Sequence, residues 1–220
     1  MKKAIAITFA FFALSCQSRA ESGTKQINTN TLKKEGKTQM DNRKTETAIF
    51  AGGCFWCTEA FFTDLKGVEK VVSGYIGGKT ANPTYKEVCS GMTGHAEAIE
   101  IIFNPDEIAY QDLLEIFFAT HDPTTINRQG ADVGSQYRSE IFYTTDAQKT
   151  AAENFIKLLT DQNIFEKKIV TKISAASTFY PAEDYHQDYY SVNPDQPYCQ
   201  AVIEPKLKKL QKNYKSKLKE

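Results

Sequence analysis

Strand-like and helix-like apolar patterns alternate along residues 47–218, and this alternation constrains the fold more than any other feature of the chain. Short runs of β-formers predict strands, whereas apolar residues spaced three or four apart predict helices. We expect strands at 47–51, 68–75, 95–103, 139–144 and 168–175. We expect helices at 54–65, 110–119, 147–160 and 205–218. Alternation of this kind within one stretch predicts a single α/β or α+β domain.

Two long segments of this domain, 120–138 and 178–198, show no clear period. Both are rich in His, Asp, Tyr, Pro and Gly side chains. Loops of this length in a compact domain usually carry function. We therefore expect functional side chains in both segments.

The N-terminal segment is typical of an export signal. Met1-Lys2-Lys3 precedes an apolar run, Ala4 to Leu14, that is too short to span a bilayer. The end of this run, Ala13-Leu14-Ser15-Cys16, resembles a bacterial lipoprotein signal, in which Cys16 is lipidated and becomes the new N-terminus. The alternatives are ordinary cleavage after Ser18-Arg19-Ala20 and retention as an uncleaved anchor. Each of the three removes the chain from the cytosol.

These features divide the chain into three parts. We expect a lipoprotein-type signal at 1–16, a flexible polar tether at 17–46, and a folded domain at 47–220 that ends in a basic helix. The tether has almost no large apolar side chains, so burial cannot offset the entropy lost on ordering it. The expected location is the envelope of a bacterium, as a membrane-anchored lipoprotein on the periplasmic side or in the outer membrane. A soluble periplasmic or secreted protein is the alternative.

The charges are distributed unevenly, although 27 basic and 27 acidic residues cancel over the whole chain. Residues 48–205 carry 11 Lys or Arg and 22 Asp or Glu, a net charge of −11. Residues 206–220 carry 7 and 1, a net charge of +6. An acidic domain repels phosphate backbones, so we expect no nucleic-acid partner. The basic tail is interpreted as a solvated last helix.

The cysteines carry the chemical argument. If Cys16 takes a lipid, the thiols that remain belong to Cys54, Cys57, Cys89 and Cys199. Gly52-Gly53 precedes Cys54 at the start of a predicted helix, where unpaired N–H groups and the helix dipole favour a thiolate. This context indicates a nucleophile. Two structural disulfides and a metal site remain alternatives, although the cysteines have no familiar zinc spacing.

Several further blocks stand out along the domain. They read GCFW (53–56), NPTY (82–85), VCSGMTGHAE (88–97), HDP (121–123), DVGSQYRS (132–139) and FYPAEDYHQ (179–187). In this order they resemble the A-type peptide methionine sulfoxide reductases, over about residues 47–210. The resemblance implies an α+β fold, a two-layer sandwich roll with a ferredoxin-like core and long ordered loops. It also implies reduction of the S-epimer of methionine sulfoxide, free or in proteins, and hence repair of oxidised proteins.

The resemblance assigns the central chemistry to two residues. Cys54 is the nucleophile that attacks the sulfoxide sulfur. Glu97 is the general acid that protonates the sulfoxide oxygen as it leaves. Glu97 lies between Ala96 and Ala98 on a predicted strand, where burial would raise the pKa of its carboxyl group.

The resemblance also assigns supporting roles around the reacting atoms. Tyr85 and Tyr137 are the phenols that donate hydrogen bonds to the sulfoxide oxygen. Asp132 is the carboxylate that orients this network. Phe55 and Trp56 form the apolar slot for the methyl group of the substrate.

The reaction leaves Cys54 as a sulfenic acid, which a second thiol converts to a disulfide. Cys199 is the favoured resolving residue, because it lies in a long C-terminal loop and matches a position used by many family members. Cys57 is the alternative, and Cys89 is interpreted as a buried small apolar residue. Thioredoxin or a thioredoxin-like dithiol protein would then reduce the disulfide.

The resemblance implies no metal and no organic cofactor, and we expect a monomer. One rival function is a thioredoxin-like dithiol–disulfide oxidoreductase that uses Cys54 and Cys57. A second rival is a disulfide-stabilised lipoprotein that binds a ligand.

Overall fold

The structure is a computed structural model that describes residues 44–219. The expected signal segment, Cys16 and residues 17–43 of the tether lie outside the described residues. The strands are β1 (Glu46–Gly52), β2 (Val68–Ile76), β3 (Ala96–Phe103), β4 (Arg128–Gln129), β5 (Asp132–Val133), β6 (Ser139–Tyr143), β7 (Lys172–Ala175) and β8 (Tyr180–Pro181). The helices are α1 (Phe55–Phe62), α2 (Tyr85–Cys89), α3 (Tyr110–Thr120), α4 (Asp146–Asp161), α5 (Tyr189–Val192) and α6 (Glu204–Asn213).

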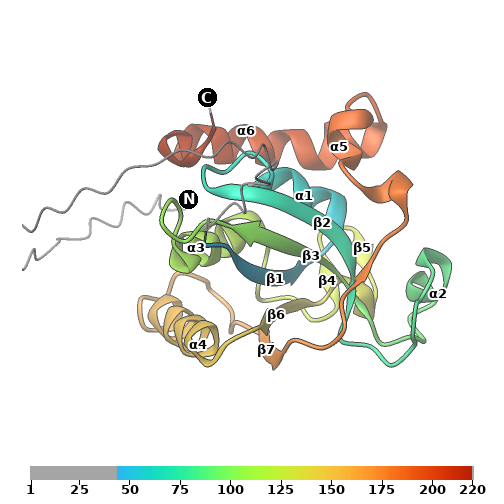
Figure 1. Cartoon of the computed structure of the whole chain (residues 1–220), viewed down its shortest axis with the longest axis horizontal. Coiled ribbons are helices and arrows are strands. Elements are labelled where there is room, and N and C mark those ends of the chain that lie inside the picture. Colours follow the sequence, from blue (N-terminus) through green and yellow to red (C-terminus); the bar gives the residue numbers. More distant parts are fainter. Residues whose placement is uncertain (1–43, 220) are drawn as a thin grey trace, which may run out of the picture. The chain divides into compact units, whose positions relative to one another are not determined.

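The main sheet has the strand order β7-β6-β1-β3-β2-β8 (Figure 1). β3 pairs antiparallel with both β1 and β2, and β6 pairs antiparallel with β1. Only the added strand β7 is parallel to its neighbour, β6. The inner order β6-β1-β3-β2, with α1 after β1 and α3 after β3, is the split βαβ arrangement of a ferredoxin-like core. The expected α+β class is therefore confirmed.

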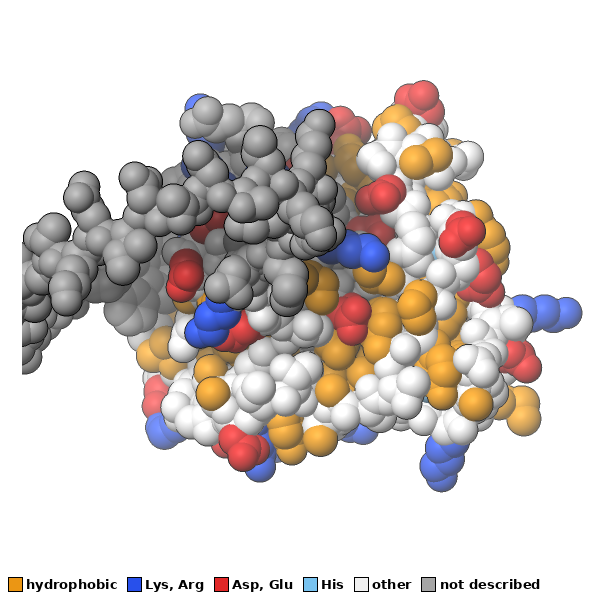
Figure 2. All heavy atoms as spheres, viewed as in Figure 1, with side chains coloured by type: hydrophobic (Ala, Val, Ile, Leu, Met, Phe, Trp, Pro, Cys, Tyr) orange, Lys and Arg blue, Asp and Glu red, His pale blue; other side chains and the backbone are white. Residues whose placement is uncertain are grey.

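The sheet is covered on both faces, so alternate residues of its strands enter two different clusters. Phe50 of β1 and Ile99 of β3 pack with α1, α3 and α6 in the main core. Ile49 of β1 and Ala98 of β3 lie on the other face, in a smaller cluster against Phe179. Ala176 and Phe179, both from the chain between β7 and β8, pack against this second cluster. In the surface view, hydrophobic side chains gather over the strands (Figure 2).

Several of the expected boundaries are wrong, among them the start of the strand expected at 168–175, since β7 begins at Lys172. The first helix begins at Phe55 with Cys54 as its N-cap and ends at Phe62. The last helix does not extend from 205 to 218, because α6 ends at Asn213 and a π-helical turn, Cys199–Ile203, precedes it. Pro205 has no backbone N–H to donate, and the wide turn before it is closed by the Glu204 N–H bonding to the Cys199 carbonyl. Cys199 is consequently buried in a helical turn and not exposed in a loop.

The short helix α2 was not predicted. Thr84 caps it, and its hydroxyl accepts from the Glu87 N–H while the Glu87 carboxylate accepts from the Thr84 N–H. This reciprocal pair is a capping box, a pattern that the sequence Thr84-Tyr85-Lys86-Glu87 does contain. Among residues 44–219, no helix is long and apolar enough to cross a membrane.

Candidate active site

Cys54 lies where β1 passes into α1. Gly53 adopts a left-handed φ of 101°, and a Cβ there would lie 2.6 Å from Cγ of Gln129, so only glycine fits this turn. The Cys54 carbonyl accepts from the N–H groups of Cys57 and Thr58, which opens the helix. The backbone therefore holds the Cys54 sulfur at the helix N-terminus, as the sequence predicted.

Glu97 reaches the same helix start from β3. Its side chain is 1% exposed, on the face of β3 that also carries Ile99 and Ile101. Oε2 of Glu97 accepts a hydrogen bond of 3.1 Å from the Phe55 N–H. Burial, and next the charge of Cys54, raise the pKa of the Glu97 carboxyl well above its usual range. This carboxyl group is thus protonated at a pH where ordinary glutamates are ionised.

Cys54 and Cys57 lie one helical turn apart, and the Cys57 N–H donates to the Cys54 carbonyl at 3.1 Å. The neighbouring Cys57 thiol, followed by burial, raises the pKa of Cys54 well above its usual range. The pKa of Cys57 is lowered, chiefly by the Cys54 thiol and also by the charge of Lys206. The two thiols of this turn therefore influence each other's ionisation in opposite directions.

All four cysteines among the described residues are free thiols. Cys89 is exposed, which contradicts its interpretation as a buried apolar residue. It lies at the last position of α2, one turn after Tyr85; burial raises the pKa of its thiol, and the nearby Tyr85 hydroxyl lowers it. Neither a disulfide pair nor, within residues 44–219, any group of three or more potential metal ligands is present.

Asp132 contacts a tyrosine that the sequence analysis did not single out. The Tyr198 hydroxyl donates to Oδ2 of Asp132 at 2.8 Å and lies 3.6 Å from the Cys57 sulfur. Asp132 is on β5, paired with Gln129 of β4, the residue that packs on Gly53. The hydrogen-bond partner of Asp132 is thus Tyr198, and not one of the two predicted phenols.

Tyr85 begins α2 and Tyr137 ends the 3-10 turn Ser135–Tyr137, and both side chains are half-buried. Burial raises the pKa of both phenols, and the charge of Glu97 contributes to each. The Tyr85 N–H donates to Oε1 of Glu183, which fixes the first turn of α2. Both hydroxyl groups therefore stay protonated and can donate hydrogen bonds.

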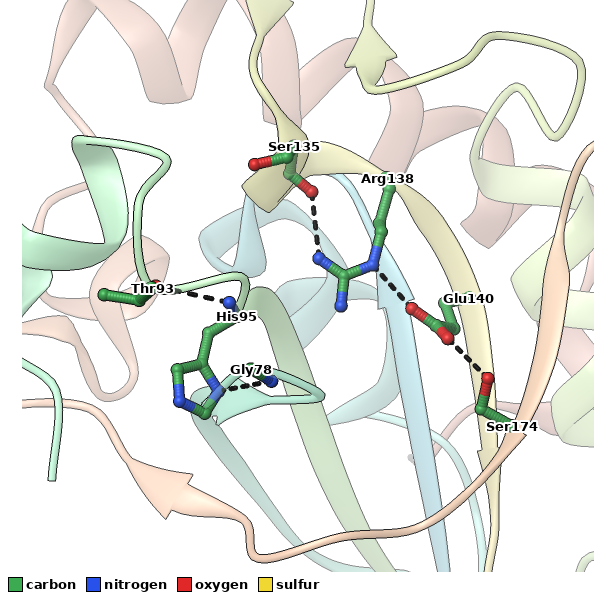
Figure 3. A network of polar contacts seen from close by, with 7 residues as sticks. All are labelled: Gly78, Thr93, His95, Ser135, Arg138, Glu140 and Ser174. Carbon is green, nitrogen blue, oxygen red and sulfur yellow. Dashed lines mark hydrogen bonds and ion pairs between the residues drawn. The ribbon is translucent and has the colours of Figure 1, made fainter. Parts of the chain in front are cut away.

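A polar network holds the segment that carries Tyr137 (Figure 3). Arg138 donates from Nε to Oε2 of Glu140 at 2.5 Å and from Nη1 to the Ser135 carbonyl at 3.1 Å. Ser174 of β7 donates to the other carboxylate oxygen of Glu140 at 2.6 Å. The network anchors the 3-10 turn Ser135–Tyr137 to the sheet.

The family described as "Peptide methionine sulfoxide reductase" matches residues 46–218. The chain belongs to this family. It is 60% identical over 173 residues to the "Peptide methionine sulfoxide reductase MsrA" of Deinococcus radiodurans, which covers 79% of this chain and 84% of that protein. It is 55% identical over 174 residues to the protein of the same name from Acinetobacter baumannii, with 79% and 99% covered.

Two solved structures agree with this assignment. Reduced Mxr1 from Saccharomyces cerevisiae has a TM-score of 0.66 at 34% identity, covering 74% of this chain and 94% of that one. "Methionine sulfoxide reductase A of Corynebacterium diphtheriae" has a TM-score of 0.61 at 34% identity, covering 68% and 76%. The predicted resemblance is confirmed, and the chain is an oxidoreductase that reduces methionine sulfoxide in a thiol-dependent reaction.

The two predicted slot residues of the reductase differ in their burial. Phe55 is 1% exposed, whereas Trp56 is half-buried. The Trp56 ring stacks on Tyr189, with centroids 3.6 Å apart and planes 6° from parallel. Its Nε1–H donates to Nδ1 of His186 at 3.1 Å, and burial lowers the pKa of this imidazole, which keeps it a neutral acceptor. The indole is thus held on two sides by the C-terminal segment.

Sequence reasoning assigned no role to Glu183, His186, Tyr189 or Tyr198 of the reductase. Glu183 accepts from the Tyr85 N–H and, through Oε2, from the Tyr75 hydroxyl at 2.8 Å. All four residues lie in the aperiodic segment 178–198, which is rich in Tyr, His and acidic side chains and was expected to carry function. The sequence indicates this segment but not which of its side chains contacts which partner.

Proposed function

We propose that the reductase acts on the S-epimer of methionine sulfoxide, free or in oxidised proteins, with Cys54 as nucleophile and Glu97 as general acid. The observation that carries this proposal is the buried Glu97 carboxyl, with its raised pKa, bonded to the first N–H of the helix that Cys54 caps. Cys54 first passes its proton to Cys57, one helical turn away. Its thiolate then attacks the sulfoxide sulfur and forms a bond between the two sulfurs while Glu97 protonates the oxygen. The substrate S–O bond and this bond between the two sulfurs then break as the hydroxyl group passes to the Cys54 sulfur. The products are methionine and the Cys54 sulfenic acid.

Tyr85 and Tyr137 donate hydrogen bonds to the sulfoxide oxygen as negative charge develops on it. Their raised pKa values support this role, because a phenolate could not donate. Trp56 forms one wall against the methyl group of the substrate, and its indole is fixed by His186 and Tyr189. The Phe55 ring lies beside it, with ring centroids 6.5 Å apart.

We infer that Cys57 is the first resolving thiol, with Cys199 second. Cys57 lies one helical turn after Cys54, with its N–H bonded to the Cys54 carbonyl, whereas Cys199 is fully buried in the turn before α6, and burial raises its pKa. Cys57 displaces the sulfenic hydroxyl to form a Cys54–Cys57 disulfide and water, and Cys199 then exchanges into that disulfide. An external thioredoxin-like dithiol supplies the two electrons, so no organic cofactor or metal is needed.

Disulfide mapping by mass spectrometry tests this scheme. After one equivalent of the S-epimer, the wild-type protein is expected to yield one methionine and a Cys54–Cys57 disulfide before any disulfide that contains Cys199. Cys57→Ser should delay disulfide formation, while Cys199→Ser should retain the first disulfide and lose turnover with the dithiol protein. The R-epimer is the control, and all thiols should remain free with it. A Cys54–Cys199 disulfide as the first product would contradict the proposed order, and an unreduced S-epimer would contradict the function.

We also propose that Cys16 carries a lipid that anchors the domain at the bacterial envelope. The apolar run and the small residue before Cys16 in the sequence support this. Cys16→Ser should release the protein from membranes without changing the rate of sulfoxide reduction, because the polar segment 17–46 separates anchor and domain. The measurement is sedimentation with membranes after a high-salt wash, with the wild-type protein as control. A mutant that still sediments would rule out the lipid anchor.

A further inference from the structure

Tyr198 bridges the resolving thiol and a carboxylate. Its hydroxyl oxygen lies 3.6 Å from the Cys57 sulfur and 2.8 Å from Oδ2 of Asp132. A phenol has one proton to donate, and an ionised carboxylate only accepts. The Tyr198 proton is therefore directed at Asp132. Whenever Cys57 is protonated, its S–H is the donor in the contact with Tyr198.

Cys57 is protonated at the moment when it has to attack. In the proposed first step it takes the proton of Cys54, so the sulfenic acid forms opposite a neutral Cys57 thiol. Only a thiolate attacks sulfur efficiently. Cys57 is 6% exposed, so solvent has little access to remove this proton directly. The contacts from Cys57 through Tyr198 to the half-exposed Asp132 provide a path by which this proton can leave.

We propose that Cys57, Tyr198 and Asp132 form a proton relay that activates Cys57 for attack on the Cys54 sulfenic acid. The inference rests on the proposed resolving role of Cys57. The Cys57 proton passes to the Tyr198 oxygen as the Tyr198 proton passes to Asp132. The Cys54–Cys57 S–S bond forms, the Cys54 S–O bond breaks, and the hydroxide takes a proton from solvent and leaves as water. Asp132 returns its proton to solvent.

The groups around Cys57 are consistent with this direction of transfer. Lys206 of α6 favours the Cys57 thiolate, and Asp132 opposes it until it takes up the proton. Among the other titratable groups nearby, the charge of Cys54 raises the pKa of Glu97 and of Tyr137, and Tyr198 also influences Cys54 itself. The Tyr198 ring meets Trp56 edge-on, with centroids 5.9 Å apart, so the phenol is held in place by more than its hydroxyl.

Tyr198→Phe tests the relay, because it keeps the ring and removes only the hydroxyl group. One methionine per protein should still form in the first turnover, while formation of the Cys54–Cys57 disulfide should slow by about 100-fold near neutral pH, the scale of proton-transfer catalysis. The loss should shrink as the pH approaches about 8.5, where an ordinary thiol ionises unaided. Tyr190→Phe, which removes a hydroxyl from the same segment, is the control. Methionine is measured by rapid quench, and the disulfide by alkylation with mass spectrometry and by the fluorescence of the chain's single tryptophan, Trp56.

Asp132→Asn provides a second test, since the amide can still accept from Tyr198 but cannot take up the proton. It should give the same pH-dependent loss in disulfide formation. A loss that is equal at every pH, or no loss in either variant, would overturn the relay, because a packing role alone does not depend on thiol ionisation. Slower methionine formation in Asp132→Asn would instead place Asp132 in the sulfoxide step. If the wild-type protein forms methionine but no Cys54–Cys57 disulfide, the resolving role of Cys57 itself fails.

Discussion

Cys54→Ser is expected to abolish methionine formation entirely, including the first turnover. A serine hydroxyl is not ionised at neutral pH, so the variant has no nucleophile to attack the sulfoxide sulfur. Cys57 cannot replace it, because Cys54 is the residue that caps α1 beside the N–H that Glu97 binds. The measurement is methionine released from one equivalent of the S-epimer by fully reduced protein. Loss of signal should be complete within the detection limit.

The matched control is Cys89→Ser. Cys89 is the one exposed cysteine among the described residues, and a serine there is close to it in size. This variant should retain most of the wild-type rate. Methionine formation by Cys54→Ser at a rate near that of Cys89→Ser would show that another thiol attacks the substrate, and would favour the rival dithiol–disulfide chemistry.

The sequence predicts individual strands and helices well, but it does not show which face of each strand is buried and against what. β3 shows why, since its residues alternate between two buried clusters and not between core and solvent. Glu97 thus shares a face with Ile99 in the main core, although the local pattern of Glu97 between two alanines is equally compatible with an exposed glutamate. Its role came from the family resemblance, and its burial from the structure.

The sequence does not predict which side chains of distant segments contact each other in the site. Tyr198 meets Asp132 across 66 residues of chain, and Trp56 meets His186 across 130. Neither pair shares an element or a periodic pattern, so their contacts depend on how the C-terminal segment packs against α1. The helix α2 is different, because its capping box was visible in the sequence and was overlooked.

Glu97→Gln is expected to slow sulfoxide reduction by about 10²–10⁴-fold, the usual contribution of a general acid. The amide can still accept from the Phe55 N–H, so the helix start is kept while the transferable proton is lost. The wild-type single-turnover rate should fall as the pH rises through the raised pKa of Glu97, because the ionised carboxylate has no proton to give. The variant should lose this dependence.

The stability of the variant separates chemistry from folding. The pKa of Glu97 is higher in the fold than in the unfolded chain, so its contribution to the free energy of unfolding is present at low pH and is lost as the pH rises through the folded-state pKa. Glutamine does not ionise, and Glu97→Gln should therefore be at least as stable as wild type at neutral pH. Glu100→Gln, on the same strand but half-buried, is the control and should keep the wild-type rate. A single-turnover rate of Glu97→Gln within about twofold of wild type would remove Glu97 from the mechanism, because an effect that small lies far below the range of general acid catalysis.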